Sequence, residues 1–102
     1  MTGEGNKGSM GEMETLERNF TIRNKFGIHA RPAALFVKTV SKFHCDIQVE
    51  KDGNIAAGKS IMGLLTIEGF QGSVINVKAT GSDAKEALDA ISHLIENKFF
   101  ED

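Results

Sequence analysis

One short stretch joins a predicted strand to a predicted helix: Gly27-Ile28-His29-Ala30-Arg31-Pro32-Ala33. A proline costs no hydrogen bond in the first turn of a helix, because the first four N–H groups there have no acceptor within the helix. His29 is therefore expected at or beside the N-cap, with the amides of Ala30 and Arg31 free to point outward. The helix dipole adds about half a positive charge at the same end, so this junction is a predicted anion-binding site.

The same junction carries a potential nucleophile. An unprotonated imidazole has a nucleophilic lone pair, and the ordinary histidine pKa of about 6.5 leaves most such rings unprotonated at neutral pH. The planar guanidinium of Arg31 matches the oxygen atoms of a phosphate. A phosphoryl group placed on the ring of His29 would therefore meet Arg31 and the nearby amides. By position alone, the usual interpretation of His29 is a partly exposed cap, and that of Arg31 is a solvated residue of the first turn.

Composition limits the class of protein. The chain has 102 residues, enough for one small domain, and its net charge of −2 argues against a generic nucleic-acid-binding protein. A single cysteine, Cys45, excludes an intrachain disulfide and suits a reducing compartment. No apolar run is long enough to span a bilayer, so we expect a cytoplasmic protein without membrane insertion. Residues 1–15 hold four glycines and only methionines as apolar residues, so we predict a flexible extension followed by one domain over residues 16–102.

Hydrophobic periodicity gives the order of the elements. Two-residue alternation predicts strands over about residues 16–23, 45–50, 54–57 and 75–79, with an Asp52-Gly53 hairpin turn between the second and third. A 3.6-residue period predicts a helix over about residues 33–43, a short helix capped by Ser60, and a last helix that ends near Lys98 or Phe99. The last helix has a predicted capping box, Asp83-x-x-Glu86, and a predicted buried face of Ala84, Ala87, Leu88, Ile91, Leu94 and Ile95.

This order, βαββαβα, indicates a two-layer α+β domain, in which one sheet is covered on one face by three helices. The short helix after Ser60 contains Ile61, Met62, Leu64 and Leu65. These are too many apolar side chains for one narrow buried stripe, so some are expected at the surface, where methionine adapts to several partners. We found no zinc-type ligand spacing, nucleotide-binding loop or catalytic triad, and so expect neither a metal nor a cofactor. His44 and His93 are expected to be structural or simply exposed.

Two runs resemble a known family. Residues 27–34, Gly-Ile-His-Ala-Arg-Pro-Ala-Ala, resemble the active-site signature of HPr, the histidine phosphocarrier of the bacterial phosphotransferase system. Residues 58–65, Gly-Lys-Ser-Ile-Met-Gly-Leu-Leu, resemble the regulatory serine segment of that family at its usual distance from the histidine. The resemblance covers about Glu17 to Phe99. It implies an open-faced β-sandwich with a four-stranded antiparallel sheet.

The resemblance also implies a function and partners. His29 would take a phosphoryl group through Nδ1 from enzyme I and pass it to enzyme IIA domains, so the chain would be a monomeric carrier rather than an independent catalyst. Ser60 would be the target of an HPr kinase/phosphorylase, and its phosphate would add about −1.5 to −2 charges beside the docking surface. That surface would include Ala34, Ile61, Met62 and Leu65.

Three alternatives stay open at this point. Phe26 stands where many sugar-type members of the family carry a small polar residue, and it resembles the bulkier residue of the nitrogen-related branch, NPr. Pro32 and the Ser60 segment look more like HPr. A second alternative is a regulatory module that acts through phosphorylated Ser60 and binds a transcriptional regulator. The third is an unrelated α+β ligand-binding protein in which His29 is only a cap.

Overall fold

The structure is a computed structural model, and it describes residues 14–101. Its elements run in the predicted order: β1 (Thr15–Thr21), α2 (Ala30–Val40), β2 (Asp46–Lys51), β3 (Asn54–Ala57), α3 (Ile61–Thr66), β4 (Val74–Thr80), α4 (Ala84–Glu96) and a single 3₁₀ turn, η1 (Lys98–Phe100). The predicted βαββαβα fold is therefore confirmed. Most of the predicted flexible extension lies outside the described residues, and β1 begins at Thr15, one residue before the predicted domain start.

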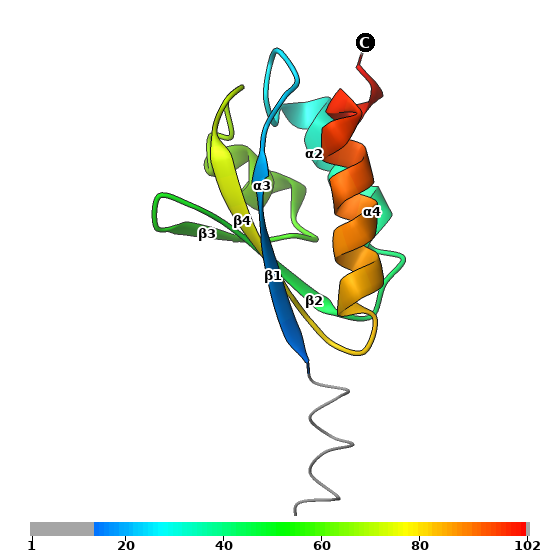
Figure 1. The fold of residues 1–102 in the computed structure, drawn as a ribbon. Helices are drawn as coiled ribbons and strands as arrows, with labels where there is room; N and C mark the ends of the chain where they lie inside the picture. The colour runs from blue at the N-terminus through cyan, green and yellow to red at the C-terminus, as the bar shows by residue number, and fades with distance from the viewer. Residues whose placement is uncertain (1–13, 102) are drawn as a thin grey trace, which may run out of the picture.

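The four strands form one antiparallel sheet in the order β1-β4-β2-β3. The helices cover one face of this sheet and leave the other open (Figure 1). The register pairs Phe20 with Ile75 and Val49 with Val77. All four of these side chains are buried, because alternate residues of a strand point to the same face. The result is the open-faced β-sandwich that the sequence predicts.

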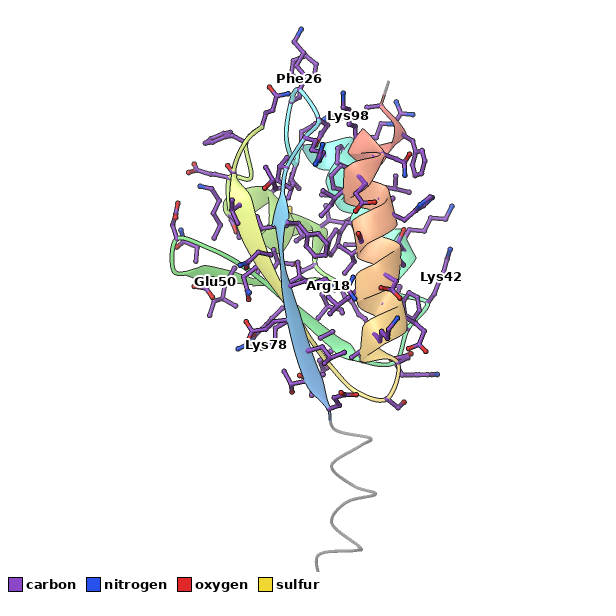
Figure 2. The ribbon with its side chains drawn as sticks, viewed as in Figure 1. Arg18, Phe26, Lys42, Glu50, Lys78 and Lys98 are labelled. Atoms are coloured by element: carbon purple, nitrogen blue, oxygen red, sulfur yellow. The ribbon has the colours of Figure 1, made fainter. Side chains whose placement is uncertain are left out.

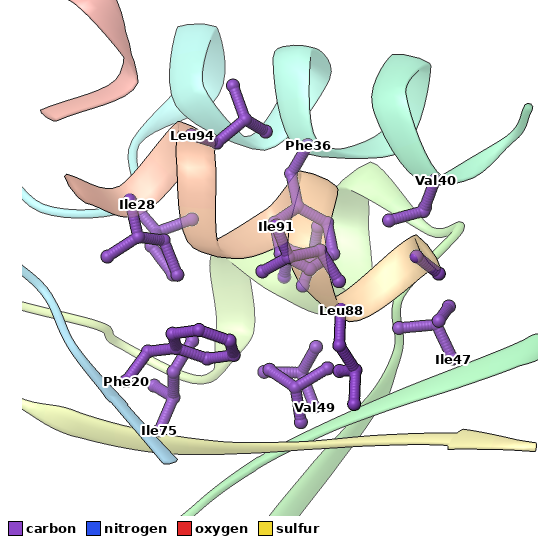
Figure 3. Packing of buried hydrophobic residues seen from close by; sticks show 14 of the residues in the cluster. Phe20, Ile28, Phe36, Val40, Ile47, Val49, Ile75, Leu88, Ile91 and Leu94 are labelled. Carbon is purple, nitrogen blue, oxygen red and sulfur yellow. The ribbon is translucent and has the colours of Figure 1, made fainter. Parts of the chain in front are cut away.

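The core lies between the sheet and the helices α2 and α4 (Figure 3). Phe36 on α2 and Ile91 on α4 are almost completely buried there, and Leu88 extends from α4 toward the sheet. The predicted buried face of α4 is confirmed at each position: Ala84, Ala87, Leu88, Ile91, Leu94 and Ile95. Within the described residues, no helix is both long and apolar enough to cross a membrane.

The last helix begins where predicted but differs from the prediction in its last residue and in the bonding of its cap. It stops at Glu96 rather than at Lys98 or Phe99, and the next turn contains three successive residues with left-handed backbone, Lys98, Phe99 and Phe100. The predicted capping box is wrong, because the side chain of Asp83 makes no cap bond to α4. Its carboxylate instead accepts the backbone N–H groups of His44, at 2.7 Å, and Cys45, at 2.9 Å. The spacing therefore predicted the start of α4 correctly, but it predicted the wrong hydrogen-bond partners for the carboxylate of Asp83.

These contacts make Asp83 a link between the start of α4 and the segment that enters β2. The His44 amide is the largest of the interactions that hold the pKa of Asp83 below its ordinary value of 3.8. Because the pKa is lower in the folded than in the unfolded protein, the carboxylate stabilises the fold above about pH 4. That contribution is lost as the pH falls through the folded-state value.

We predict that Asp83→Asn destabilises the protein at neutral pH and that its deficit relative to the wild type shrinks as the pH approaches 3. Urea unfolding at several pH values measures the difference. Asp46→Asn is the matched control, since the exposed carboxylate of Asp46 makes no side-chain hydrogen bond among the described residues. A deficit for Asp83→Asn that is independent of pH would contradict the prediction.

Candidate functional site

The loop between β1 and α2 is fixed by a close approach of two backbones. Gly27 has a positive φ of 67°, and a methyl group added there would overlap the carbonyl oxygen of Gly69. The same oxygen accepts the backbone N–H of Ile28 at 2.8 Å. The side chain of Ile28 is buried in the core, so the residue before His29 is held from two sides. Only glycine combines this conformation with this contact at low cost.

His29 lies at the N-cap of α2, as predicted. Its backbone is extended, and its carbonyl oxygen accepts the N–H of Ala33 at 2.9 Å. The imidazole does not cap the helix, and 41% of the side chain is exposed. Among the described residues, the amides of Ala30 and Arg31 have no hydrogen-bond acceptor. The nucleophile is thus accessible, and the donors beside it are available to an anion.

Two further residues of the site were not predicted from the sequence. The imidazole Nε2 of His29 lies 2.9 Å from Oε2 of Glu101, whose side chain is only 17% exposed. The other oxygen of Glu101 accepts Nδ2 of Asn24 at 2.9 Å, and the same Nδ2 donates to the carbonyl of Gly27 at 2.7 Å. Glu101 is 72 residues from His29. The sequence holds no periodicity or motif that could have linked them.

The surroundings of the imidazole combine cations and an exposed aromatic ring. A hollow of about 340 Å³ is lined by Lys25, Phe26, Arg31, Phe100 and Glu101. Phe26 is 70% exposed, and its ring meets that of His29 edge to face, with the centroids 6.1 Å apart. Figure 2 places Phe26 at the tip of its loop and Lys98 at the same end of the molecule. The C-terminal residues are thereby part of the site.

The Ser60 segment forms a separate region. Ser60 caps α3, as predicted, and its hydroxyl accepts the N–H of Gly63 at 3.0 Å. Ile61 and Met62 are exposed, whereas Leu64 is buried, so the prediction that part of this apolar run faces solvent is confirmed. Ala34 is exposed and Leu65 is partly exposed. The role of these residues in docking stays a prediction.

The remaining candidates do not form a site. His44 and His93 are exposed. Within residues 14–101 there is no group of three or more His, Cys, Asp and Glu side chains that could hold a metal ion. Cys45 is buried, and desolvation, aided by the hydrogen bond and charge of Asp83, raises the pKa of its thiol to about 11. A thiol in that state is a poor nucleophile and a poor metal ligand.

An exposed imidazole at the start of a helix, on an open-faced β-sandwich of this size, is an arrangement that suits a small phosphoryl carrier. Residues 16–97 match the family described as "PTS HPr component phosphorylation site". The chain therefore belongs to the HPr family of phosphocarrier proteins of the phosphotransferase system.

Individual relatives agree with this assignment. The phosphocarrier protein HPr of Xylella fastidiosa Temecula1 is 42% identical over 85% of this chain and 98% of its own length. The HPr-like protein Crh of Halalkalibacterium halodurans is 40% identical over 81% of this chain and 99% of its own. A crystal structure of HPr from Thermoanaerobacter tengcongensis superposes with a TM-score of 0.82 at 49% identity, covering 85% of this chain and 98% of that one.

We predict that Gly27→Ala destabilises the protein much more than Gly53→Ala. Both glycines have a positive φ, but an added methyl group at Gly53 meets nothing within 4 Å. Gly53→Ala should therefore lower the free energy of unfolding only by the cost of a left-handed backbone conformation for alanine, about 1–2 kcal/mol. Gly27→Ala should cost about 1–3 kcal/mol more, because the two loops must separate. Urea unfolding measures both, and equal costs would show that the contact with Gly69 is not a constraint.

Proposed function

We propose that His29 accepts a phosphoryl group from enzyme I and passes it to an enzyme IIA domain of a sugar phosphotransferase system. The observation that carries this proposal is the exposed imidazole of His29 beside two amides, those of Ala30 and Arg31, that have no acceptor among the described residues. Membership of the HPr family supports the same role. The chain would act as a carrier between partner enzymes, not as an independent catalyst.

The charges around His29 suit a phosphoryl group that must be bound and then passed on. The cations of Lys25 and Arg31 line the hollow, and they would attract the negative oxygens of a phosphoryl group. Transfer of a phosphoryl group depends mainly on alignment and on charge stabilisation, so a carrier needs few groups of its own. The exposed side of the imidazole would let a donor or an acceptor approach and complete the site. A deep pocket would hold the group too tightly for onward transfer.

We assign a regulatory role to Ser60 and a docking role to the apolar residues around it. A phosphate on Ser60 would place negative charge beside Ile61 and Met62, both of which are exposed. Desolvating that charge under a partner would be costly, so the modification would weaken docking without touching His29. An HPr kinase/phosphorylase would add the phosphate. In this proposal the chain is a cytoplasmic monomer, and Ala34 and Leu65 extend the same surface.

A second candidate is a regulatory module in which phosphorylated Ser60 binds a transcriptional regulator and His29 is little used. The similarity to an HPr-like protein, Crh, favours keeping it. The exposed Phe26 beside His29 likewise keeps the nitrogen-related branch open as an alternative to sugar transport. The two experiments that follow separate a relay from a regulatory module.

Incubation with radiolabelled phosphoenolpyruvate and enzyme I tests the relay. We expect an acid-labile, alkali-stable label on the intact protein, and we expect His29→Ala to abolish it. His44→Ala is the matched control, because it removes an exposed imidazole elsewhere on the surface and should keep the label. An unlabelled intact protein, or a labelled His29→Ala variant, would reject the proposal.

Replacement of Ser60 tests the regulatory role. Asp and Asn both can cap a helix, so Ser60→Asp and Ser60→Asn should each preserve α3 and differ only in charge. We expect the Asp variant to accept the phosphoryl group from enzyme I at least about tenfold more slowly. A tenfold change corresponds to about 1.4 kcal/mol of binding free energy, which is a modest effect for a charge placed at an interface. The Asn variant should stay near the wild-type rate. Equal rates for the two variants would contradict the role of charge at Ser60.

A further inference from the structure

Glu101 bridges the two segments that meet at the site. Its Oε2 contacts Nε2 of His29 and its Oε1 contacts Nδ2 of Asn24, each at 2.9 Å. Asn24 belongs to the β1–α2 loop, whereas Glu101 follows η1, and the two segments lie at the same end of the molecule (Figure 1). A carboxylate can only accept hydrogen bonds, so the imidazole must donate from Nε2. In a neutral ring this leaves the lone pair on Nδ1.

The orientation of Asn24 is fixed by its partners. Its Nδ2 faces two acceptors, the carbonyl oxygen of Gly27 and Oε1 of Glu101, and an amide NH₂ group has two hydrogens for them. If the amide oxygen and nitrogen of Asn24 were exchanged, its oxygen would face the carbonyl oxygen of Gly27 and Oε1 of Glu101, and none of the three atoms could donate. Asn24 is 2% exposed, and among the described residues its Oδ1 has no hydrogen-bond partner. An unpaired buried amide oxygen is a cost to stability, and the two hydrogen bonds that Nδ2 donates oppose it.

The turn that presents Glu101 is itself unusual. Lys98, Phe99 and Phe100 all have φ between 54° and 56°, a left-handed conformation that is unfavourable for a residue with a side chain. The side chain of Phe99 is buried and holds this turn against the core. Such a conformation persists only where the surroundings impose it. The backbone of the C-terminal turn is therefore committed to one geometry, and that geometry places the carboxylate on the imidazole.

We propose that Glu101, oriented by Asn24, is a positioning residue that keeps the proton of His29 on Nε2 and so presents the Nδ1 lone pair to the incoming phosphoryl group. This inference rests on the proposed function, in which His29 is the acceptor. The resemblance already implies transfer through Nδ1; the inference goes further by giving a physical cause for that choice of atom in Glu101 and Asn24, two residues outside the signature around His29.

The transfer step balances without a proton leaving the ring. The Nδ1 lone pair forms the new bond to phosphorus, and the bond from phosphorus to the donor breaks, with its electron pair remaining on the donor. The proton stays on Nε2, so the imidazole gains positive charge as the new bond forms. The carboxylate of Glu101 lies 2.9 Å from that nitrogen and stabilises the charge, as carboxylates paired with histidine do in other sites.

Two substitutions of Glu101 give opposite expectations for a tautomer effect and for a packing effect. In Glu101→Gln, the atom of Asn24 that faces position 101 is the donor Nδ2. The new amide oxygen must therefore face Asn24, and the new NH₂ must face His29. The imidazole then has to accept at Nε2 and carries its proton on Nδ1, where it blocks the lone pair. Glu101→Ala leaves the ring without a partner and free to exchange the proton. The tautomer effect makes Gln the more harmful change, whereas a loss of packing would make Ala the more harmful.

Phosphorylation rates with enzyme I as donor provide the first measurement. We expect Glu101→Gln to slow phosphorylation of His29 by about 10- to 100-fold, and Glu101→Ala to have a smaller effect. Glu50→Gln is the matched control, because it makes the same change of charge on the open face of the sheet, far from the site, and should keep the wild-type rate. A wild-type rate for Glu101→Gln, or a larger loss for Ala than for Gln, would overturn the inference.

Nitrogen-15 chemical shifts of the His29 ring provide a second measurement that needs no phosphoryl transfer. At a pH about two units above the ordinary histidine pKa of about 6.5, the wild type should show a protonated Nε2 and an unprotonated Nδ1. Glu101→Gln should show the reverse, and Glu101→Ala a mixture. Identical ring states in the three proteins would overturn the inference. If the shifts follow this pattern but the intact protein takes no label from enzyme I, the proposed function fails and the assignment of the tautomer stands.

Discussion

The contact between Gly27 and Gly69 is the constraint on which the site depends. It brings the β1–α2 loop against the α3–β4 loop, and the Ile28 amide bonds to the carbonyl of Gly69 at the same place. Ile28 can then enter the core while the next residue emerges at the surface. This reversal within two residues sets His29 at the N-cap of α2, and the following amides of Ala30 and Arg31 have no acceptors among the described residues. A side chain at position 27 would separate the loops and move the imidazole relative to these donors.

The charges at the site serve two requirements that oppose each other. Lys25 and Arg31 favour binding of a negative group, and so do the amides at the start of α2. Glu101 adds negative charge, but its carboxylate contacts Nε2, the ring nitrogen that the phosphoryl group does not use in our proposal. Glu101 lines the same hollow as Lys25 and Arg31, so its charge also opposes tight binding of a negative group there. A carrier built this way can hold the group without binding it irreversibly.

The loop after the first strand and the turn after the last helix meet at this site although they are far apart in the chain. The loop after the first strand supplies Asn24 and His29, and the turn after the last helix supplies Glu101. Burial of Phe99 ties the turn to the core, so the stability of the fold and the geometry of the imidazole share the same contacts. The Ser60 segment lies on another element, α3, and none of its side-chain hydrogen bonds reaches His29. In our proposal, a phosphate on Ser60 would thus alter docking while the reacting group keeps its geometry.

Local pattern was enough to predict the order of elements, the buried face of α4, the cap at Ser60 and the place of His29 at the start of α2. Each of these depends on residues within one or two turns of one another, where spacing determines which side chains share a face. Tertiary structure decided the rest. Asp83 bonds to the amides of His44 and Cys45 instead of capping its own helix, and Glu101 reaches His29 across 72 positions of sequence. Such contacts depend on how strands and helices pack in three dimensions, and no periodicity in the chain encodes that packing at the level of single atoms.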